Sequence, residues 1–329
     1  MAVSLFFAQI RHGTNMGKTA YLYDKIFLAH DTGLSHPECP ERLIAIDDKI
    51  RSAPYYKSLV KVKPSMPDLQ HIQAIHTPAY IDRVRREIEG GARYLDSMDT
   101  EVCPRSYEVA LMAAGGCLNM CDTVMSGAAQ HGFCAIRPPG HHAESDSAEG
   151  FCIFNNIAIA ARYLQKQHAL SRIAIIDWDV HHGNGTQHTF YRDNTVLYIS
   201  LHQYPHFPGT GSILEKGDGP GEGFTMNFPM NRGDGDTEYI AIFTSQIIPA
   251  LDKFMPDIIL ISAGFDAHRA DPLSSINLST EAYGEFTTML LDASRQSCQG
   301  KVIAFLEGGY HLNALANGID QVMKAFTEA

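Results

Sequence analysis

The chain of 329 residues has 45% hydrophobic and 19% charged residues and a formal net charge of −11. This apolar content is typical of a packed globular protein and excludes an intrinsically disordered chain. The acidic balance argues against nucleic-acid binding, which requires clustered Lys and Arg, and no apolar run approaches the roughly 18 residues of a membrane span.

Strand and helix patterns alternate along most of the chain. We expect residues 1–18 to form an N-terminal extension and residues 19–329 a single domain, because no stretch is typical of a linker. In chain order the patterns predict a strand over 21–29, helices over 41–51, 77–89 and 104–124, a strand over 132–136, a helix over 155–167, a strand over 173–176, a helix over 185–191, strands over 195–201 and 224–229, a helix over 236–254, a strand over 257–262, a helix over 280–297, a strand over 301–306 and a helix over 311–327.

The seven cysteines give no sign of disulfides or of a thiolate metal site. Their number is odd, and no Cys-x-x-Cys pair occurs. Cys117 and Cys121 lie one helical turn apart on an apolar face, where buried core thiols are expected. The chain is therefore expected to be a reduced, cytoplasmic protein.

The predicted strands indicate an α/β fold. Their apolar residues are continuous rather than alternating, as in a parallel sheet that is covered by helices on both faces. Ligands bind such open sheets at the carboxyl ends of the strands, where loops from several strands meet. Candidate functional residues are therefore sought just after each predicted strand.

The strand over 173–176 is followed directly by polar residues. Alternate side chains of an extended chain share a face, so Asp177, Asp179 and His181 point one way. Two carboxylates and an imidazole on one face form either a metal site or a coupled acid/base site, since they would repel and dehydrate one another without a cation.

Three further polar clusters follow predicted strands. They are Arg137 to His142, Ser262 to Asp266 and Glu307 to Tyr310. Taken singly, these clusters could reflect turn formation, helix capping and packing of an aromatic ring. Four clusters at four strand ends instead predict one convergent site.

These segments closely resemble the zinc-dependent histone deacetylase superfamily, and in particular its class II branch and bacterial relatives, which include acetylpolyamine amidohydrolases. The resemblance extends from about Gly17 to the C-terminus. It implies an arginase/deacetylase-like open parallel sheet of about eight strands. The segments that carry it are 36–43, 137–142, 150–152 with 155–156, 177–185, 208–211, 262–266 and 307–310.

The resemblance also implies a catalytic centre. Asp179, His181 and Asp266 correspond to the ligands of one zinc ion per chain, although an oxygen-rich ligand set leaves Fe(II) or Co(II) open. His141 corresponds to an imidazole held by Asp177.

The remaining catalytic positions follow from the same resemblance. His142 corresponds to the general base and acid, paired with Asn184, and Tyr310 to the tyrosine that donates to the substrate carbonyl. Because Asn184 carries no charge to stabilise an imidazolium, a low pKa is expected for His142.

The substrate path is assigned by resemblance as well. Gly150, Phe151 and Phe207 correspond to the walls of a narrow tunnel, for which core packing is the alternative. Leu273 falls where polyamine-specific relatives carry an acidic residue. The path is completed by Gly308, by Asp99 at the rim, and by Arg42, which lines an acetate channel or forms a structural salt bridge.

Monovalent cation sites, occupied by K⁺ in the family, rest wholly on the resemblance. Backbone carbonyls supply most of the ligands and leave no sequence signal. The corresponding residues are Asp177, Asp179, His181, Ser200 and Leu201 for one site, and Phe190, Asp193, Val196 and Phe224 for the other.

The sequence therefore predicts a zinc-dependent amidohydrolase that removes acetyl or related acyl groups from lysine side chains. The expected partner is an acylated lysine peptide or an acetylated small amine, and neither nucleic acid nor membrane. Alternatives are an acetylpolyamine amidohydrolase, an arginase-type ureohydrolase and a non-catalytic acyl-lysine reader. The sequence leaves the oligomeric state open, including a homo-oligomer.

Overall fold

Eight short strands pair in parallel into one sheet in the computed structural model, which describes residues 18–329. The order across the sheet is β2-β1-β3-β8-β7-β4-β5-β6. This arrangement confirms the expected open parallel sheet. The strands are β1 Thr19–Leu22, β2 Val60–Val62, β3 His131–Cys134, β4 Ile173–Asp177, β5 Val196–Gln203, β6 Thr225–Met230, β7 Ile258–Ala263 and β8 Val302–Leu306.

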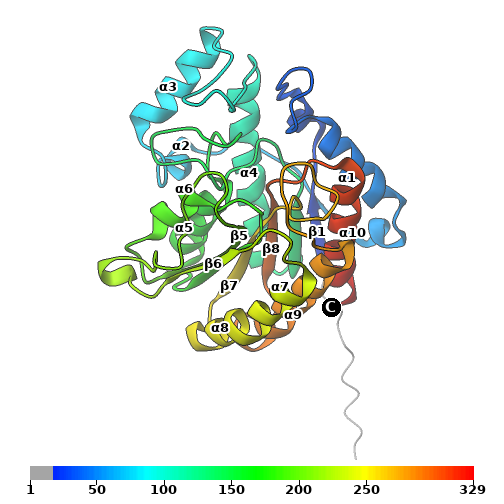
Figure 1. Ribbon diagram of the computed structural model, residues 1–329. Coiled ribbons are helices and arrows are strands. Elements are labelled where there is room, and N and C mark those ends of the chain that lie inside the picture. Colours follow the sequence, from blue (N-terminus) through cyan, green and yellow to red (C-terminus); the bar gives the residue numbers. More distant parts are fainter. Residues whose placement is uncertain (1–17) are drawn as a thin grey trace, which may run out of the picture.

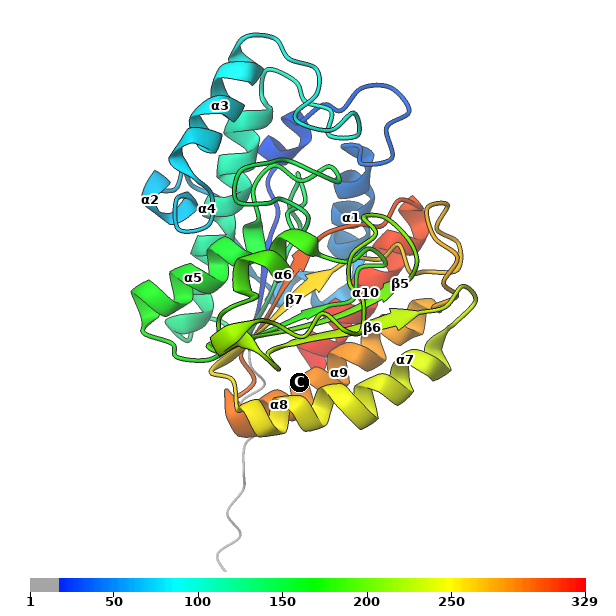
Figure 2. The same cartoon turned by 60° about the vertical axis from the view of Figure 1, so that its left-hand side comes forward.

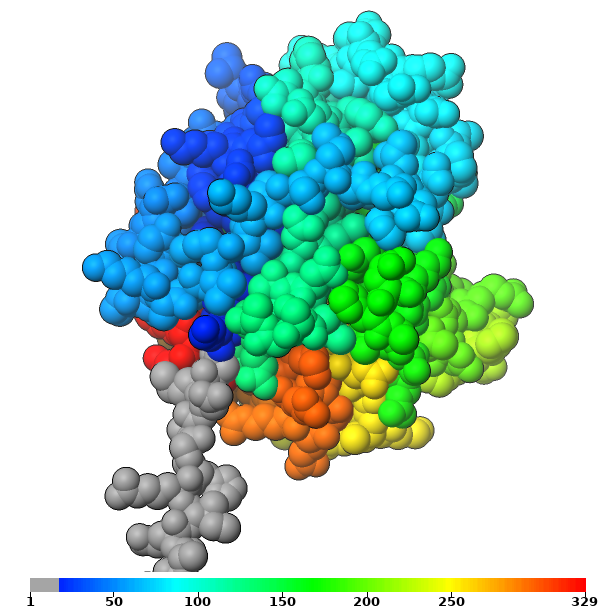
Figure 3. Space-filling view, turned by 180° about the vertical axis from the view of Figure 1, so that it is seen from behind, coloured from blue at the N-terminus to red at the C-terminus, as the bar shows by residue number. Residues whose placement is uncertain are grey.

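Helices cover both faces of the sheet, which lies in the middle of the molecule (Figure 1). The α-helices are α1 Glu41–Ser52, α2 Leu69–Ile72, α3 Pro78–Glu89, α4 Ser106–Met125, α5 Asn156–His168, α6 Asn184–Phe190, α7 Asp236–Ile242, α8 Ile248–Phe254, α9 Thr280–Ser297 and α10 Leu312–Glu328. Figure 2 shows α1, α10, α9 and α8 on one side and α4 and α5 on the other. Seen from behind, α4 and α5 lie side by side (Figure 3).

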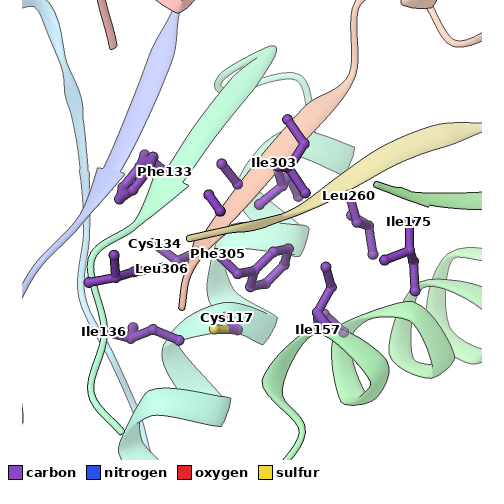
Figure 4. Packing of buried hydrophobic residues seen from close by; sticks show 14 of the residues in the cluster. Cys117, Phe133, Cys134, Ile136, Ile157, Ile175, Leu260, Ile303, Phe305 and Leu306 are labelled. Carbon is purple, nitrogen blue, oxygen red and sulfur yellow. The ribbon is translucent and has the colours of Figure 1, made fainter. Parts of the chain in front are cut away.

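The central strands are buried on both faces, which explains their continuous apolar sequences. Every residue of β4, β7 and β8 is buried. Phe305 and Leu260 pack with residues of the neighbouring strands and of α4 and α5, including the buried thiol of Cys117 (Figure 4). Cys117 and Cys121 are thus core residues, as expected, and no cysteine of the described chain forms a disulfide.

One predicted strand is wrong in extent. The segment expected to be a strand over 21–29 forms β1 and then a 3₁₀ turn, Lys25–Ala29. The reason is Asp24, whose carboxylate accepts a hydrogen bond from the backbone N–H of Ile26 at 2.9 Å and so turns the chain. The sequence interpretation also missed β2 and α2, which are too short for a periodic pattern.

The helix predicted over 236–254 is interrupted by a π-helical turn, Phe243–Ile247, between α7 and α8. Pro249, in the first turn of α8, has no N–H to donate back along the helix. The wider turn accommodates this missing donor and keeps the two helical segments continuous. A helix start was predicted correctly at α3, where Thr77 accepts from the N–H of Tyr80 at 3.2 Å and Pro78 comes first.

The division of the chain into an extension and one domain stays a prediction. Of the expected extension over 1–18, residues 1–17 lie outside the described residues. In the described part of the chain, no helix combines the length and apolar character that crossing a membrane requires. The expected cytoplasmic location likewise stays a prediction.

The packing predicts a large difference between two leucine-to-alanine substitutions. Leu260 is fully buried in β7, whereas Leu214 is 81% exposed. We expect Leu260→Ala to lower the free energy of unfolding by about 2–5 kcal/mol, because it opens a cavity in the core. Leu214→Ala should change it by less than about 0.5 kcal/mol. Urea denaturation measures both, and equal effects would contradict the assigned core.

Candidate active site

Three potential metal ligands meet where β4 and its neighbour β7 end. Asp179 and His181 follow β4, and Asp266 follows β7. One ligand atom of each lies within 4.8 Å of the others, the only such group in residues 18–329. His181 Nδ1 is 3.1 Å from Asp179 Oδ1 and 3.2 Å from Asp266 Oδ2.

The chemistry of this group fits a divalent cation. The carboxylates of Asp179 and Asp266 are fully buried, and Asp266 Oδ2, although 3.2 Å from His181 Nδ1, has no partner aligned for a hydrogen bond in the described structure. Space is kept for them by Gly264 and Gly308, since a Cβ at Gly264 would overlap Asp179 and one at Gly308 would overlap both carboxylates. Two buried negative charges at this separation require a cation between them. One imidazole and two carboxylates also leave a coordination position open for substrate.

Asp177, the last residue of β4, holds the first of two adjacent histidines. Its Oδ2 lies 3.1 Å from His141 Nδ1 and accepts a second hydrogen bond, also 3.1 Å long, from the hydroxyl of Tyr198. Burial disfavours a charged His141, but the carboxylates of Asp177 and Asp179 outweigh burial and raise the pKa of His141 to about 10. The two carboxylates therefore favour the charged form of His141.

His142 has the opposite character. Its Nδ1 lies 2.7 Å from Asn184 Oδ1. Burial, aided by the neighbouring rings of His141 and His181, lowers the pKa of His142 well below its usual value. The direction agrees with the expectation from the sequence, but the cause differs, because the hydrogen bond to Asn184 raises this pKa and burial overcomes it.

Tyr310 is held at the site by its backbone and by an arginine. Asp271 accepts hydrogen bonds from the N–H groups of Tyr310 at 2.7 Å and Leu273 at 3.0 Å. Arg42 lies 5.2 Å from the centre of the Tyr310 ring and donates to the carbonyl of Gly309 at 2.7 Å. Burial raises the pKa of the phenol, so Tyr310 keeps its proton and can donate it.

The expected tunnel residues surround the two histidines and the tyrosine. The Phe207 ring lies 5.1 Å from that of His142, and the Phe151 ring lies 5.9 Å from that of Tyr310. At Gly150, which has φ +56°, a Cβ would overlap the ring of His142. Phe207 thus contacts the ring of His142 and Phe151 that of Tyr310, while a tunnel between them stays a prediction.

Asp99 and Leu273, predicted for the substrate path, are engaged in local contacts. The Asp99 carboxylate accepts from the hydroxyls of Ser97 and Thr100, at 3.1 Å for Thr100. The Leu273 carbonyl lies 3.0 Å from Nε2 of His206, whose ring stacks on His181 with centres 5.0 Å apart. The rim at residue 273 is thus connected to a candidate metal ligand.

The residues predicted for monovalent cations lie on β4, α6 and β5 and in the segments after β4, before β5 and before β6. Asp177 and Ser200 are register partners. In the second set, the carbonyl of Phe190 accepts from the N–H of Asp193 at 3.0 Å, and that of Phe224 accepts from Tyr198 at 2.9 Å. Potassium binding at either set stays a prediction.

The sequence interpretation missed several buried charges that support the site. Glu307 accepts from the N–H groups of Gly140 at 2.7 Å and His141 at 3.2 Å, and burial raises its pKa to about 7. Glu38 forms ion pairs with Arg42 at 3.0 Å and with Arg137, and all three side chains are fully buried. No sequence pattern marks Glu38, which lies among prolines and charged residues, whereas Glu307 directly follows an apolar strand. For Arg42 the structure provides the expected salt bridge, while its role in an acetate channel stays a prediction.

A model of the histone deacetylase domain matches residues 36–326. The chain belongs to the histone deacetylase family. A relative named a probable deacetylase, from Archaeoglobus fulgidus, is 38% identical over 294 residues, which are 89% of this chain and 81% of that protein. The polyamine deacetylase HDAC10 of Homo sapiens is 36% identical over 92% of this chain and 47% of its own length.

The fold of the family is seen in a solved structure. The crystal structure of the HDA15 HD domain matches with a TM-score of 0.89 and 36% identity, covering 94% of this chain and 89% of that one. Membership of the family supports hydrolytic deacetylase activity, and the buried Asp179, His181 and Asp266 could bind a metal ion.

The repulsion between Asp179 and Asp266 predicts that Asp266→Asn changes thermal stability differently without and with zinc. Without metal, Asp266→Asn should leave the melting temperature equal to or above that of the wild type, because it removes one of two repelling charges and retains the oxygen that accepts from Val180. With excess zinc, the wild type should gain about 4 kcal/mol at 1,000 times the dissociation constant, and Asp266→Asn much less.

Differential scanning fluorimetry in EDTA and in zinc measures both effects. Asp257→Asn is the matched control, because Asp257 also accepts from backbone N–H groups but lies outside the site. It should retain the full response to zinc. An undiminished zinc response in Asp266→Asn would exclude Asp266 as a ligand.

Proposed function

We propose that this protein is a zinc-dependent deacetylase that hydrolyses the acetyl amide of lysine side chains. The observation that carries the proposal is the buried group of Asp179, His181 and Asp266, with an unpartnered carboxylate oxygen, beside two histidines and a tyrosine. The three ligands would hold one Zn²⁺. Bound there, the ion would polarise the amide carbonyl and acidify a water molecule.

The chain's own residues supply the proton transfers. His142, with its low pKa and with Nδ1 engaged by Asn184, accepts a proton at Nε2 from the attacking water and later delivers it to the leaving amine. Tyr310 donates its phenolic hydrogen to the amide oxygen as negative charge develops there. His141, oriented by Asp177, lies beside His142 with ring centres 4.0 Å apart and helps to position it.

An acyl-lysine in a peptide suits the proposed tunnel better than an acetylated polyamine. A tunnel bounded by Phe151 and Phe207 accepts an aliphatic stem. At the rim, Leu273 offers no negative charge to a second ammonium group, which would lose hydration without gaining a partner. The polyamine substrate remains the second candidate, because one relative is named a polyamine deacetylase.

A substrate panel tests the proposed function. We expect hydrolysis of acetyl-lysine and trifluoroacetyl-lysine peptides that EDTA abolishes and zinc restores, with kcat/KM on the order of tenfold or more above that for acetylputrescine. Leu273→Glu should reduce the ratio of kcat/KM between the peptides and acetylputrescine, because its carboxylate adds a partner for the cationic amine.

Two outcomes would contradict the assignment. Absence of metal-dependent hydrolysis with all three substrates would exclude the proposed activity. A preference of the unmodified protein for acetylputrescine would leave the deacetylase activity standing and overturn the role given to Leu273.

Removing the phenolic hydroxyl separates catalysis from metal binding. Tyr310→Phe should keep its zinc content, since the hydroxyl is not a proposed ligand, and lose on the order of 10²–10³ in kcat. Metal analysis and steady-state kinetics give the two quantities. Tyr56→Phe, a tyrosine in the 3₁₀ turn Pro54–Ser58 before β2, should retain activity. Undiminished kcat in Tyr310→Phe would remove the tyrosine from the mechanism.

A further inference from the structure

The partner of His142 is itself held by two carboxylates. Asn184, the first residue of α6, is 4% exposed. Its Oδ1 faces His142 Nδ1, and its Nδ2 donates to Glu144 Oε1 at 2.7 Å and to Glu149 Oε2 at 2.8 Å. Neither glutamate is among the family segments that mark the catalytic residues in the sequence.

The two carboxylates determine which way the amide points. A carboxylate only accepts hydrogen bonds, and the amide of Asn184 has one accepting end and one donating end. The NH₂ group must therefore face Glu144 and Glu149, because the opposite orientation would place the amide oxygen against two negative charges. This leaves Oδ1 for His142.

The orientation of the amide in turn determines the proton position on the ring. Since Oδ1 can only accept, Nδ1 of a neutral His142 must carry the hydrogen, and Nε2 is left with its lone pair. That nitrogen is the one a reacting water would need as its base. The opposite tautomer would place a hydrogen on Nε2 and prevent it from accepting one.

Both glutamates are fixed in place by their own contacts. The Glu144 carboxylate also lies 2.7 Å from His188 Nδ1, and its carbonyl lies 2.8 Å from His76 Nδ1. The backbone of Glu149 exchanges hydrogen bonds with Cys152 at 2.9 and 3.3 Å. The loop between residues 144 and 152 therefore fixes the two glutamates, and the glutamates orient the side-chain amide of Asn184.

We propose that Glu144 and Glu149 are positioning residues for the general base, which together orient the Asn184 amide and thereby keep the hydrogen of neutral His142 on Nδ1. The catalytic consequence rests on the proposed deacetylase function. The consequence for the tautomer does not, because it follows from the hydrogen bonds alone.

Exchanging the donors and acceptors of the network tests the proposal. In Glu144→Gln/Glu149→Gln, the two charges that favour one amide orientation are gone and only the long contact of Asn184 Nδ2 with the His142 carbonyl, 3.4 Å, still favours it. The amide can then adopt both orientations, so kcat should fall on the order of 10- to 100-fold with KM nearly unchanged. Asn184→Asp should also lose activity, because it places a third carboxylate beside two others. Combining all three changes should restore kcat to within about threefold of the wild type, since two glutamines then donate to the carboxylate that replaces the amide.

A purely structural role predicts no such rescue, because the losses would accumulate in the triple variant. Glu89→Gln, at the exposed last residue of α3, is the control for a glutamate-to-glutamine change and should retain activity. Should the double variant fail to fold, the comparison uses Asn184→Asp alone and combined with each single glutamine variant. The combinations should then recover part of the kcat that Asn184→Asp loses.

The tautomer is read directly from ¹⁵N-histidine NMR spectra of the zinc-loaded protein, with His142 assigned by its loss in His142→Ala. The wild type and the triple variant should show hydrogen on Nδ1, and the double variant a mixture. An unchanged Nδ1–H tautomer in the double variant would overturn the proposal. If the wild type shows the expected tautomer shifts but hydrolyses no substrate, the deacetylase function fails and the positioning role stands.

Discussion

The central constraint is the burial of two carboxylates, Asp179 and Asp266, at the ends of adjacent strands. The parallel pairing of β4 with β7 places both at one edge of the sheet, where neither can reach water. Their repulsion has to be offset by a cation, and their volume has to be accommodated by glycine at 264 and 308. Gly264 after β7 and Gly308 after β8 thus leave the room that the two carboxylates occupy.

The two adjacent imidazoles of this site have opposite pKa shifts. His141 lies between Asp177 and Asp179, so its pKa is raised despite burial. One residue later, His142 faces a neutral amide, and burial lowers its pKa. The negative charge that Asn184 lacks is present one hydrogen bond further away, in Glu144 and Glu149. At that distance it can orient the amide without holding a proton on the ring.

The sequence predicted what depends on local periodicity. Alternation after β4 separated Asp177, Asp179 and His181 from Trp178, which packs against aromatic rings of α9 as an apolar residue should. It could not predict the turn at Asp24, because a single side-chain hydrogen bond ended β1 within an otherwise apolar run. It also could not reveal the role of Glu144 and Glu149, because their partner Asn184 lies 40 and 35 residues away. In the sequence they cannot be distinguished from solvated glutamates of a surface loop.

Leu273, at the proposed substrate rim, and Tyr310 share one support of their backbone. Asp271 bonds the N–H groups of both Leu273 and Tyr310, so the rim loop and the tyrosine loop cannot move independently. His206 extends this connection from the Leu273 carbonyl to the ring of His181. A change of side chain at 273 alters contacts with substrate, whereas a change in the backbone there would also displace the tyrosine. The roles proposed for Leu273 in substrate choice and for Tyr310 as oxyanion donor would therefore be coupled through the single buried carboxylate of Asp271.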